Sequence, residues 1–282
     1  MGKTDFENNR ERYLLNISSV IICALLLFPL YWMLATSLKF ETDIFKSPPS
    51  FFPERFFFDS YLTQLKGGDY NMFGAFFNSA VISLSSMALS TILAIPAAYG
   101  LARFRFRGKK ALILTFLVTQ MLPAVFVLTP LFILYQKFGL INTYLSPILS
   151  DATIGIPFSV LILRTYFLSI PRELDDSAKV DGCNHFTAFL RIMVPIAYPG
   201  IIVSVVFSFL YAWGDLVYGL TFINKQSMRP ITAGIFNYLG QYGTSWNYLM
   251  AFGVVTILPV MLIFIFMQKY IISGLTSGAV KG

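Results

Sequence analysis

Apolar residues along this chain gather into long runs that short polar stretches separate. The first run covers residues 17–38, and five more cover about 73–101, 112–135, 146–168, 199–222 and 248–270. A helix crosses the hydrocarbon core of a bilayer with about 20 predominantly apolar residues. The pattern therefore predicts an all-α membrane protein with six transmembrane helices.

The third and fourth predicted spans each contain two prolines, which would break a helix in water. Pro123 and Pro130 lie within the third apolar run, and Pro147 and Pro157 lie within the fourth. Prolines are tolerated in membrane helices because neighbouring helices satisfy the backbone groups that they free. They predict kinks that would help a helix bundle to rock between two states.

Basic residues at the ends of the apolar runs predict the orientation of the chain. Five basic residues and no acid follow the second run, and three more basic residues lie between the fourth and fifth runs. Since cytoplasmic turns carry an excess of lysine and arginine, both turns should be cytoplasmic, as should both termini. We therefore expect a cytoplasmic amino terminus over 1–13, a six-span domain over 14–271 and a cytoplasmic tail over 272–282. The basic residues are Arg103, Arg105, Arg107, Lys109 and Lys110 in the first turn, and Arg172, Lys179 and Arg191 in the second.

Composition supports a bilayer as the solvent of this chain. Of its 282 residues 56% are hydrophobic and only 12% are charged, against about 25% charged in soluble domains. A net charge of +7 raises the possibility of nucleic-acid binding. We predict no nucleic-acid partner, because the arginines and lysines form short patches between spans.

The sequence contains no pattern typical of a catalytic or metal-binding site. His185 is the sole histidine, and no group of histidines, cysteines and acids has the spacing of a metal site. No pair of residues suggests an activated nucleophile and its base. We expect a protein that is not an enzyme and that holds no metal or cofactor itself.

The segment 171–195 is the one long polar interruption in the apolar second half, and it predicts two short helices around a break. Pro171 suits a first helical turn, and the acids that follow it complement the helix dipole. Gly182 can adopt the positive φ that closes a helix, Asn184 can cap the next helix, and Pro195 should stop that helix. Leu174, Ser177, Ala178 and Asp181 are expected on one narrow face of the first helix, open to a large partner; Phe186, Phe189, Leu190 and Met193 are expected on the apolar face of the second.

This segment resembles the cytoplasmic coupling loop of the membrane subunits of bacterial ABC importers. In that family a Glu-Ala-Ala triplet precedes a glycine and an Ile-x-Leu-Pro ending, for which Asp176-Ser177-Ala178, Gly182 and Ile192-Met193-Val194-Pro195 stand here. Asp176, Ser177 and Val194 depart from the pattern conservatively. The resemblance implies that the loop docks into a groove of an ATPase subunit through Glu173, Asp176, Ser177, Ala178, Asp181, Gly182 and Pro195. An ordinary amphipathic loop between two spans is the alternative.

A second resemblance, to carbohydrate-type ABC permeases, covers nearly the whole chain. Residues 211–215, 221–222, 242–244 and the ending 274–282 are similar to the shorter membrane subunit of maltose-type importers. The likeness implies three partners in a bacterial plasma membrane: a second homologous permease, an ABC ATPase dimer that holds ATP and Mg²⁺, and an extracytoplasmic solute-binding protein. It also implies that Gly278, Lys281 and Gly282 of the tail contact the ATPase, with disorder as the alternative.

Sugars are neutral, so a path for them needs hydrogen-bonding groups and aromatic faces rather than a strong field. Asn78, Trp213, Asp215 and Tyr218 are candidates to line it. Asp215 lies within the fifth span and an intramembrane carboxylate is a functional candidate, although helix capping would also explain it. Asp151 and Arg164 are expected at the two interfaces of the fourth span.

A transport subunit is thus the favoured interpretation, and an ion-coupled secondary carrier is the alternative. Carriers of that class place ionisable residues near the middle of the bilayer and often show internal repeats, and neither is clear here. The substrate is expected to be a sugar or oligosaccharide, which the sequence does not specify further.

Overall fold

A computed structural model describes residues 2–66, 71–240 and 243–276, with side chains for 12–66, 71–236, 238 and 244–268. The chain divides into two compact units. The first comprises residues 1–67 and 235–257, and the second comprises 68–234 and 258–282.

The described residues form helices of the length and apolarity that a membrane requires. Four unbroken helices qualify, over 12–37, 72–103, 145–169 and 246–268. Two bent pairs qualify as well if each counts as one span: Lys109–Met121 with Ala124–Lys137, and His185–Ile196 with Tyr198–Gly214. The all-α membrane class is therefore confirmed, and strand structure in the described part is confined to a hairpin of β1 (Leu239–Gly240) and β2 (Gly243–Thr244).

The first unit joins α1 (Gly2–Ser37) to two short helices, α2 (Glu41–Ile44) and α3 (Asp59–Lys66), and to the start of α14 (Trp246–Thr276). Helix α1 begins well before residue 17, because a polar stretch can extend a helix without entering the bilayer. The hydroxyl of Ser60 donates to the carbonyl of Ser37 at 2.7 Å, and the amide of Gln64 donates to the carbonyl of Tyr248 at 3.0 Å. These bonds hold the segment after α1 against the ends of α1 and α14. Residues 235–238 form a 3₁₀ turn, η3 (Ile235–Tyr238).

Buried Lys39 marks the end of α1 in this unit. Its ammonium lies 4.8 Å from the centre of the Trp32 ring and also donates to the carbonyl of Ser50. Burial lowers the pKa of Lys39, and the nearby carboxylate of Asp43 partly opposes that shift. The cation thus draws the loop after α1 back onto the helix.

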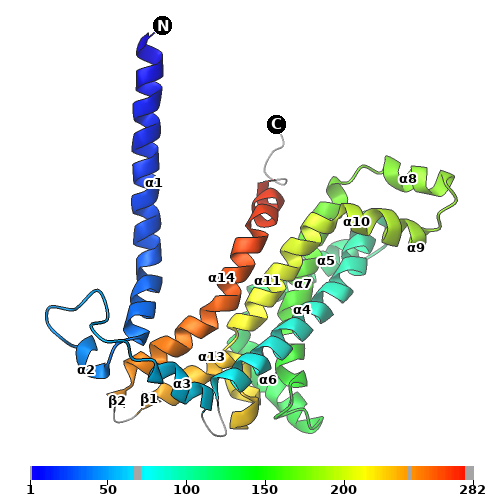
Figure 1. Ribbon diagram of the computed structural model, residues 1–282. Coiled ribbons are helices and arrows are strands. Elements are labelled where there is room, and N and C mark those ends of the chain that lie inside the picture. The colour runs from blue at the N-terminus through cyan, green and yellow to red at the C-terminus, as the bar shows by residue number, and fades with distance from the viewer. Residues whose placement is uncertain (1, 67–70, 241–242, 277–282) are drawn as a thin grey trace. The chain divides into compact units, whose positions relative to one another are not determined.

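The core of the second unit is made by α4 (Met72–Arg103), α7 (Leu145–Ser169) and α11 (Tyr198–Gly214), which run alongside one another in Figure 1. Small residues allow this close approach, as is usual for membrane helices. Ala94 and Ala98 of α4 are completely buried. A Cβ atom on Gly155 of α7 would lie 2.6 Å from the hydroxyl of Ser90.

Two of the predicted spans are broken rather than continuous. The third consists of α5 (Lys109–Met121) and α6 (Ala124–Lys137), which meet at 99°. Leu122 between them is extended, with φ −78° and ψ 122°, because the ring of a following proline disfavours the helical conformation. The prediction of one continuous helix over 199–222 is wrong, because α11 ends at Gly214 and α12 (Val217–Phe222) begins after Asp215 and Leu216.

Short elements complete the second unit. Between α7 and α11 lie α8 (Glu173–Val180), α9 (His185–Ala188), the π-turn η1 (Phe189–Met193) and α10 (Val194–Ile196). After α12 come the 3₁₀ turn η2 (Gln226–Met228) and α13 (Ile231–Gly234). The first of these groups is the segment that the sequence marks as a functional loop.

Candidate functional site

Helix α8 of this loop ends in a motif that needs glycine. Gly182 has φ +80°, and its N–H donates to the carbonyl of Lys179 at 3.0 Å. The N–H of Cys183 donates back to the carbonyl of Ala178 at 2.9 Å. This pair of bonds is the Schellman arrangement, in which a left-handed residue closes a helix. The predicted conformation of Gly182 is therefore confirmed.

The second helix of the loop begins as predicted but does not end as predicted. The side chain of Asn184 accepts from the N–H of Thr187 at 2.8 Å and so caps the helix. Pro195 does not stop it, because the helix continues to Ile196 and turns by 75° only at Ala197. The π-turn explains this, because Val194 donates to Phe189 five residues earlier and the widened turn accommodates a proline next to it.

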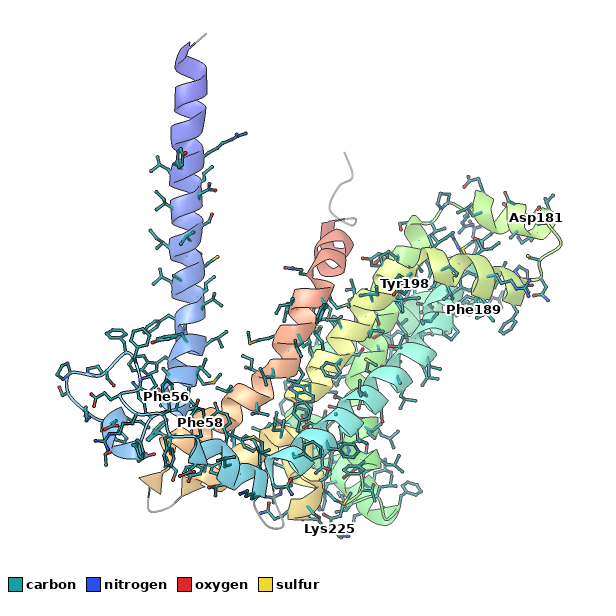
Figure 2. All side chains as sticks on the ribbon, viewed as in Figure 1. Phe56, Phe58, Asp181, Phe189, Tyr198 and Lys225 are labelled. Carbon is teal, nitrogen blue, oxygen red and sulfur yellow. The ribbon has the colours of Figure 1, made fainter. Side chains whose placement is uncertain are left out.

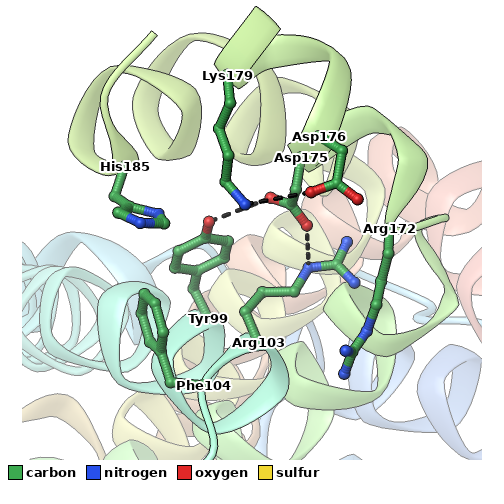
Figure 3. A pocket seen from close by; sticks show the side chains of 8 residues that line it. All are labelled: Tyr99, Arg103, Phe104, Arg172, Asp175, Asp176, Lys179 and His185. Atoms are coloured by element: carbon green, nitrogen blue, oxygen red, sulfur yellow. Dashed lines mark hydrogen bonds and ion pairs between the residues drawn. The ribbon is translucent and has the colours of Figure 1, made fainter.

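A buried ion pair anchors the loop to the end of α4. Nε of Arg103 lies 2.8 Å from a carboxylate oxygen of Asp175, and the two side chains are 7% and 15% exposed. Arg103 also donates to the carbonyl of Ile170 at 3.0 Å, while the hydroxyl of Tyr99 donates to Asp175 at 3.2 Å. Figure 3 shows Arg103 and Tyr99 reaching from α4 toward Asp175 of α8. The loop is thus tied to a membrane helix and does not hang free.

Aromatic packing surrounds this ion pair. The ring of Tyr99 lies 5.5 Å from that of Phe167, 4.9 Å from that of Phe189 and 6.0 Å from that of Phe104. Beside it is a polar pocket of about 230 Å³ that Arg172, Asp176, Lys179 and His185 also line (Figure 3). Packing from α4, α7 and η1 therefore limits how far α8 can move without them.

The predicted contact residues divide into an outward and an inward group. Glu173, Asp176, Ser177, Asp181, Gly182 and Pro195 are exposed, as are the apolar Val180 at 88% and Phe186 at 67%. Figure 2 shows Asp181 at the end of α8, at the tip of the loop. Ala178 is only 1% exposed, so the face expected to be open to a partner is closed at its middle. Its small side chain lets α8 pack against the rest of its own loop.

The expected apolar face of the second helix is divided in the same way. Met193 is completely buried and Phe189 is half-buried, whereas Phe186 and Leu190 are exposed. Ala188, which the sequence does not single out, is 4% exposed. The second helix of the loop therefore packs one apolar face against its own bundle and leaves another apolar face exposed to a partner.

Sequence reasoning missed the importance of Arg103 and the true role of Asp175. Arg103 is predicted only as one charge of a cytoplasmic cluster, and Asp175 only as a partner of the helix dipole. Their pairing joins residues 72 positions apart. The one signal in the sequence is that a basic residue ends the second apolar run just before an acidic segment follows the fourth.

Asn78, predicted to line a solute path, is occupied by the protein itself. Its amide donates to the carbonyls of Ser227 and Arg229 at 2.9 and 3.0 Å, and its oxygen accepts from Tyr144 at 2.7 Å. The side chain is 4% exposed. These bonds hold the segment around η2 against α4, and they leave Asn78 no donor for a solute.

The other three predicted path residues are also engaged in the fold. The carboxylate of Asp215 accepts from the N–H groups of Tyr218 and Gly219 at 3.0 and 3.1 Å, and so caps α12. Tyr218 is completely buried and stacks on Phe222 with ring centres 5.8 Å apart. Trp213 is 3% exposed and its ring packs 5.2 Å from that of Phe76. In this conformation Asp215 therefore caps a helix, which is the alternative to lining a solute path.

Two features of the span region escaped the sequence reasoning. Asp151, expected at an interface, is instead 2% exposed within α7, and neither carboxylate oxygen has a hydrogen-bond partner among the described residues. Nearby, a pocket of about 370 Å³ lies between α5, α7 and α11. Gln120, Ser208 and the half-exposed Tyr211 supply its polar groups.

Gly278, Lys281 and Gly282 of the carboxyl-terminal tail lie outside the described residues. Among the described residues, no group of three or more histidines, cysteines and acids could hold a metal ion. Candidates for function among the described residues include the clamped loop over 171–195, the pocket between α5, α7 and α11, and the buried Asp151.

Helices long and apolar enough to cross a membrane, together with an exposed helical loop, indicate a multi-pass membrane protein. Similar proteins identify its family. The chain belongs to the family of binding-protein-dependent transport system inner membrane components, whose family model matches residues 90–277. That range includes the clamped loop, and it makes the protein a transport subunit rather than an enzyme.

Curated relatives align over nearly the whole chain. The probable ABC transporter permease protein YurM of Bacillus subtilis is 33% identical over 90% of this chain and 84% of its own length. The arabinooligosaccharides transport system permease protein AraQ of the same species is 34% identical over 96% of both chains. The diacetylchitobiose uptake system permease protein DasC of Streptomyces coelicolor is 29% identical over 95% of this chain and 96% of its own length.

Solved structures share the fold. A bacterial ABC transporter involved in the import of the acidic polysaccharide alginate contains a chain with a TM-score of 0.78 and 18% identity, over 96% of this chain and 98% of that one. A second alginate ABC transporter structure, in complex with a periplasmic protein that carries an alginate pentasaccharide, has a TM-score of 0.64 and 19% identity over 95% of this chain and 97% of that one.

Proposed function

We propose that this chain is a permease subunit of an ABC importer that moves a sugar or oligosaccharide, and that the loop over 171–195 couples it to a separate ATPase. The family supports transport that depends on a binding protein. Relatives named for arabinooligosaccharides and diacetylchitobiose support a carbohydrate as the solute.

The observation that carries the proposal is the combination of a firm anchor and a free outer face on one loop. The ion pair of Arg103 with Asp175 is nearly buried, whereas Val180 at 88% and Phe186 at 67% exposure face outward together with the acid Asp181. Exposed apolar side chains rimmed by charge are typical of a protein–protein contact. A partner that moved this face would move the end of α4 with it.

The coupling then follows from the two states of the partner. ATP binding would draw two ATPase subunits together, and each would carry the loop of the permease seated on it. Only a difference in affinity of the loop for the two ATPase states can shift the permease between its own states. ATP and Mg²⁺ belong to the ATPase in this scheme, and no cofactor is required of this chain.

The remaining partners are proposed on the same grounds. A second homologous permease would complete the translocation path, and an extracytoplasmic binding protein would deliver the solute. The basic turns at Arg103–Lys110 and Arg172–Arg191 favour a cytoplasmic location for the loop and for both termini. Gly278, Lys281 and Gly282 of the tail would add a second contact with the ATPase. The chain would reside in the bacterial plasma membrane.

A neutral sugar needs hydrogen-bonding groups beside aromatic faces. The pocket between α5, α7 and α11 offers these chiefly through Tyr211, whose side chain is half-exposed, beside Gln120 and Ser208, which also bond to Ile154 and Ser159. Asn78, Trp213 and Tyr218, by contrast, are buried. We therefore propose this pocket as the part of the chain that faces the solute path.

The buried carboxylate of Asp151 is the observation that favours an ion-coupled carrier as a second candidate. An unpaired intramembrane acid often marks an ion or proton pathway. Uptake measured in vesicles with ATP held constant separates the two functions. An ABC importer should keep its uptake rate when an uncoupler dissipates the proton gradient, and an ion-coupled carrier should lose it.

Gly182 provides the test of coupling, because it has φ +80° and no atom within 4 Å of the position of an added Cβ. Gly182→Val would therefore disturb the backbone that closes α8 without creating a clash, at a cost of about 1–3 kcal/mol. We expect the variant to insert normally and to lose most solute-stimulated ATP hydrolysis in proteoliposomes that contain the whole transporter.

Gly139 is a matched control for this experiment. It too has a positive φ, of +68°, and open space where a Cβ atom would be added, but it follows α6, away from the loop. Gly139→Val should suffer similar backbone strain and retain stimulated hydrolysis. Equal loss in both variants, or normal stimulation in Gly182→Val, would contradict the coupling role of the loop.

A further inference from the structure

A basic pocket beside the turn between α4 and α5 is separate from the loop and from the proposed solute path. It has a volume of about 670 Å³ and combines residues from this turn with one from the inner half of α7. Apolar side chains form part of its wall. Its lining includes the cations Arg105, Lys109, Lys110 and Arg164, and the apolar residues Phe106 and Ile113.

The positive charge of this pocket is not neutralised within the described part of the chain. No carboxylate there lies within ion-pair distance of its four cations. Nε of Arg164 is buried and has no hydrogen-bond partner among the described residues, and the ammonium of Lys109 donates to the carbonyl of Phe104 at 3.2 Å, a neutral acceptor. A buried donor without an acceptor and a set of like charges both cost free energy that a bound anion would recover.

The position of the pocket indicates which kind of anion it would bind. Helix α4 ends at Arg103 and α5 begins at Lys109. Since α4 is a candidate span helix and α5 is the first half of a bent pair that qualifies as a span, the cations lie where membrane helices reach the water. Phe104, Phe106 and Leu112 beside them are 44%, 48% and 41% exposed. Cations at this depth next to exposed apolar side chains match a phosphate headgroup whose acyl chains stay in the bilayer.

We infer that this pocket binds the headgroup of an anionic phospholipid. The guanidinium of Arg164 and the ammonium groups of Lys109 and Lys110 would hold the phosphate, while Phe106 and Ile113 would contact the first part of the acyl chains. A soluble acidic protein would gain nothing from these apolar residues, and it would have to reach to the level of the membrane surface. The inference does not depend on the solute or on the ATPase.

Native mass spectrometry of the full-length chain in detergent tests the inference, with dioleoyl phosphatidylglycerol and dioleoyl phosphatidylcholine as probes. We expect tighter binding of phosphatidylglycerol. Arg164→Gln combined with Lys110→Gln should weaken that binding about 25-fold, since each cation near an anionic lipid contributes about fivefold. Binding of phosphatidylcholine should not change.

Lys137→Gln combined with Lys225→Gln is the matched control, because it removes the same charge from exposed positions elsewhere in the second unit. It should leave phosphatidylglycerol binding intact, as should Arg164→Lys with Lys110→Arg, which keeps the charge of the pocket. Equal weakening in the control, loss of binding in the charge-conserving variant or full binding by the glutamine variant would overturn the inference. So would displacement of the lipid by millimolar inorganic phosphate, or a glutamine variant that keeps the lipid and instead fails to co-purify with the ATPase.

Discussion

Arg103 and Asp175 show how much one pair of side chains decides in this protein. Both belong to charged segments most of whose other members are exposed, yet these two are nearly buried and lie 2.8 Å apart. A buried pair of this kind contributes little compared with apolar packing, but breaking it leaves a charge that nothing compensates. The pair therefore acts as a latch between α4 and α8.

We expect Arg103→Met to weaken the attachment of the loop by about 3–5 kcal/mol, because Asp175 would be left buried and unpaired. Trypsin cleavage at the exposed residues Arg172 and Lys179 should accelerate in the detergent-solubilised protein, and the melting temperature should fall. Arg107→Met removes an exposed arginine from the same turn and should have little effect on either measurement.

A double variant separates loss of the pair from loss of packing. Arg103→Met combined with Asp175→Leu removes both charges, so the protein should recover part of the lost stability. If the double variant loses as much free energy of unfolding as Arg103→Met and Asp175→Leu lose together, the two residues are not energetically coupled. The ion pair would then not act as a latch.

At the scale of elements, the close packing of α7 on α11 depends on glycine. A Cβ atom on Gly200 of α11 would lie 2.4–2.8 Å from three ring atoms of Tyr166 on α7. A ring held between two helices has no free end that could rotate away, so the helices themselves would have to separate. This contact lies near the cytoplasmic ends proposed above, where the loop joins both helices.

Gly200→Ala should therefore destabilise the bundle by about 1–3 kcal/mol through overpacking, seen as a lower melting temperature. Gly100 of α4 serves as the control, because no atom lies within 4 Å of the place that an added Cβ would take. Gly100→Ala should be neutral or stabilising by about 0.5–1 kcal/mol, as alanine is the better helix former. A Gly200→Ala variant as stable as the wild type would show that Tyr166 can move aside.

At the scale of the whole molecule, the proposed function requires one orientation in the membrane. The loop must face the cytoplasm, where an ATPase operates, and the turn after α6 must face the opposite side. Lys137 ends α6 and Asp181 lies at the tip of the loop, and both are exposed. These two positions are suited to report which side of the membrane each turn occupies.

We expect Lys137→Cys to react with a membrane-impermeant maleimide in spheroplasts, and Asp181→Cys to react only after permeabilisation. The background should carry Cys23→Ser and Cys183→Ser, because these are the two native cysteines. The same labelling of both positions in sealed spheroplasts, or the reverse order, would rule out the orientation that the coupling scheme needs.

The sequence by itself determined the apolar spans, the all-α class and the two helices of the loop. It also determined the glycine that closes α8 and the asparagine that caps the next helix. Each of these rests on residues within a few positions of one another, where period, capping and backbone conformation act. The break at Asp215 is also a local feature, because this carboxylate caps α12 within the next four residues. The sequence did not lead to it, because Asp215 was interpreted first as a residue of the solute path.

Only the tertiary structure decided what each polar side chain does. It paired Arg103 with Asp175, turned Ala178 inward, committed Asn78 to the carbonyls of a distant segment and buried Asp151 without a hydrogen-bond partner among the described residues. The surroundings of these residues come from far away in the chain, and no periodicity or spacing specifies which helices meet. The physical reason is that burial and pairing are properties of a packed bundle, whereas a sequence pattern reports only the preferences of one helix at a time.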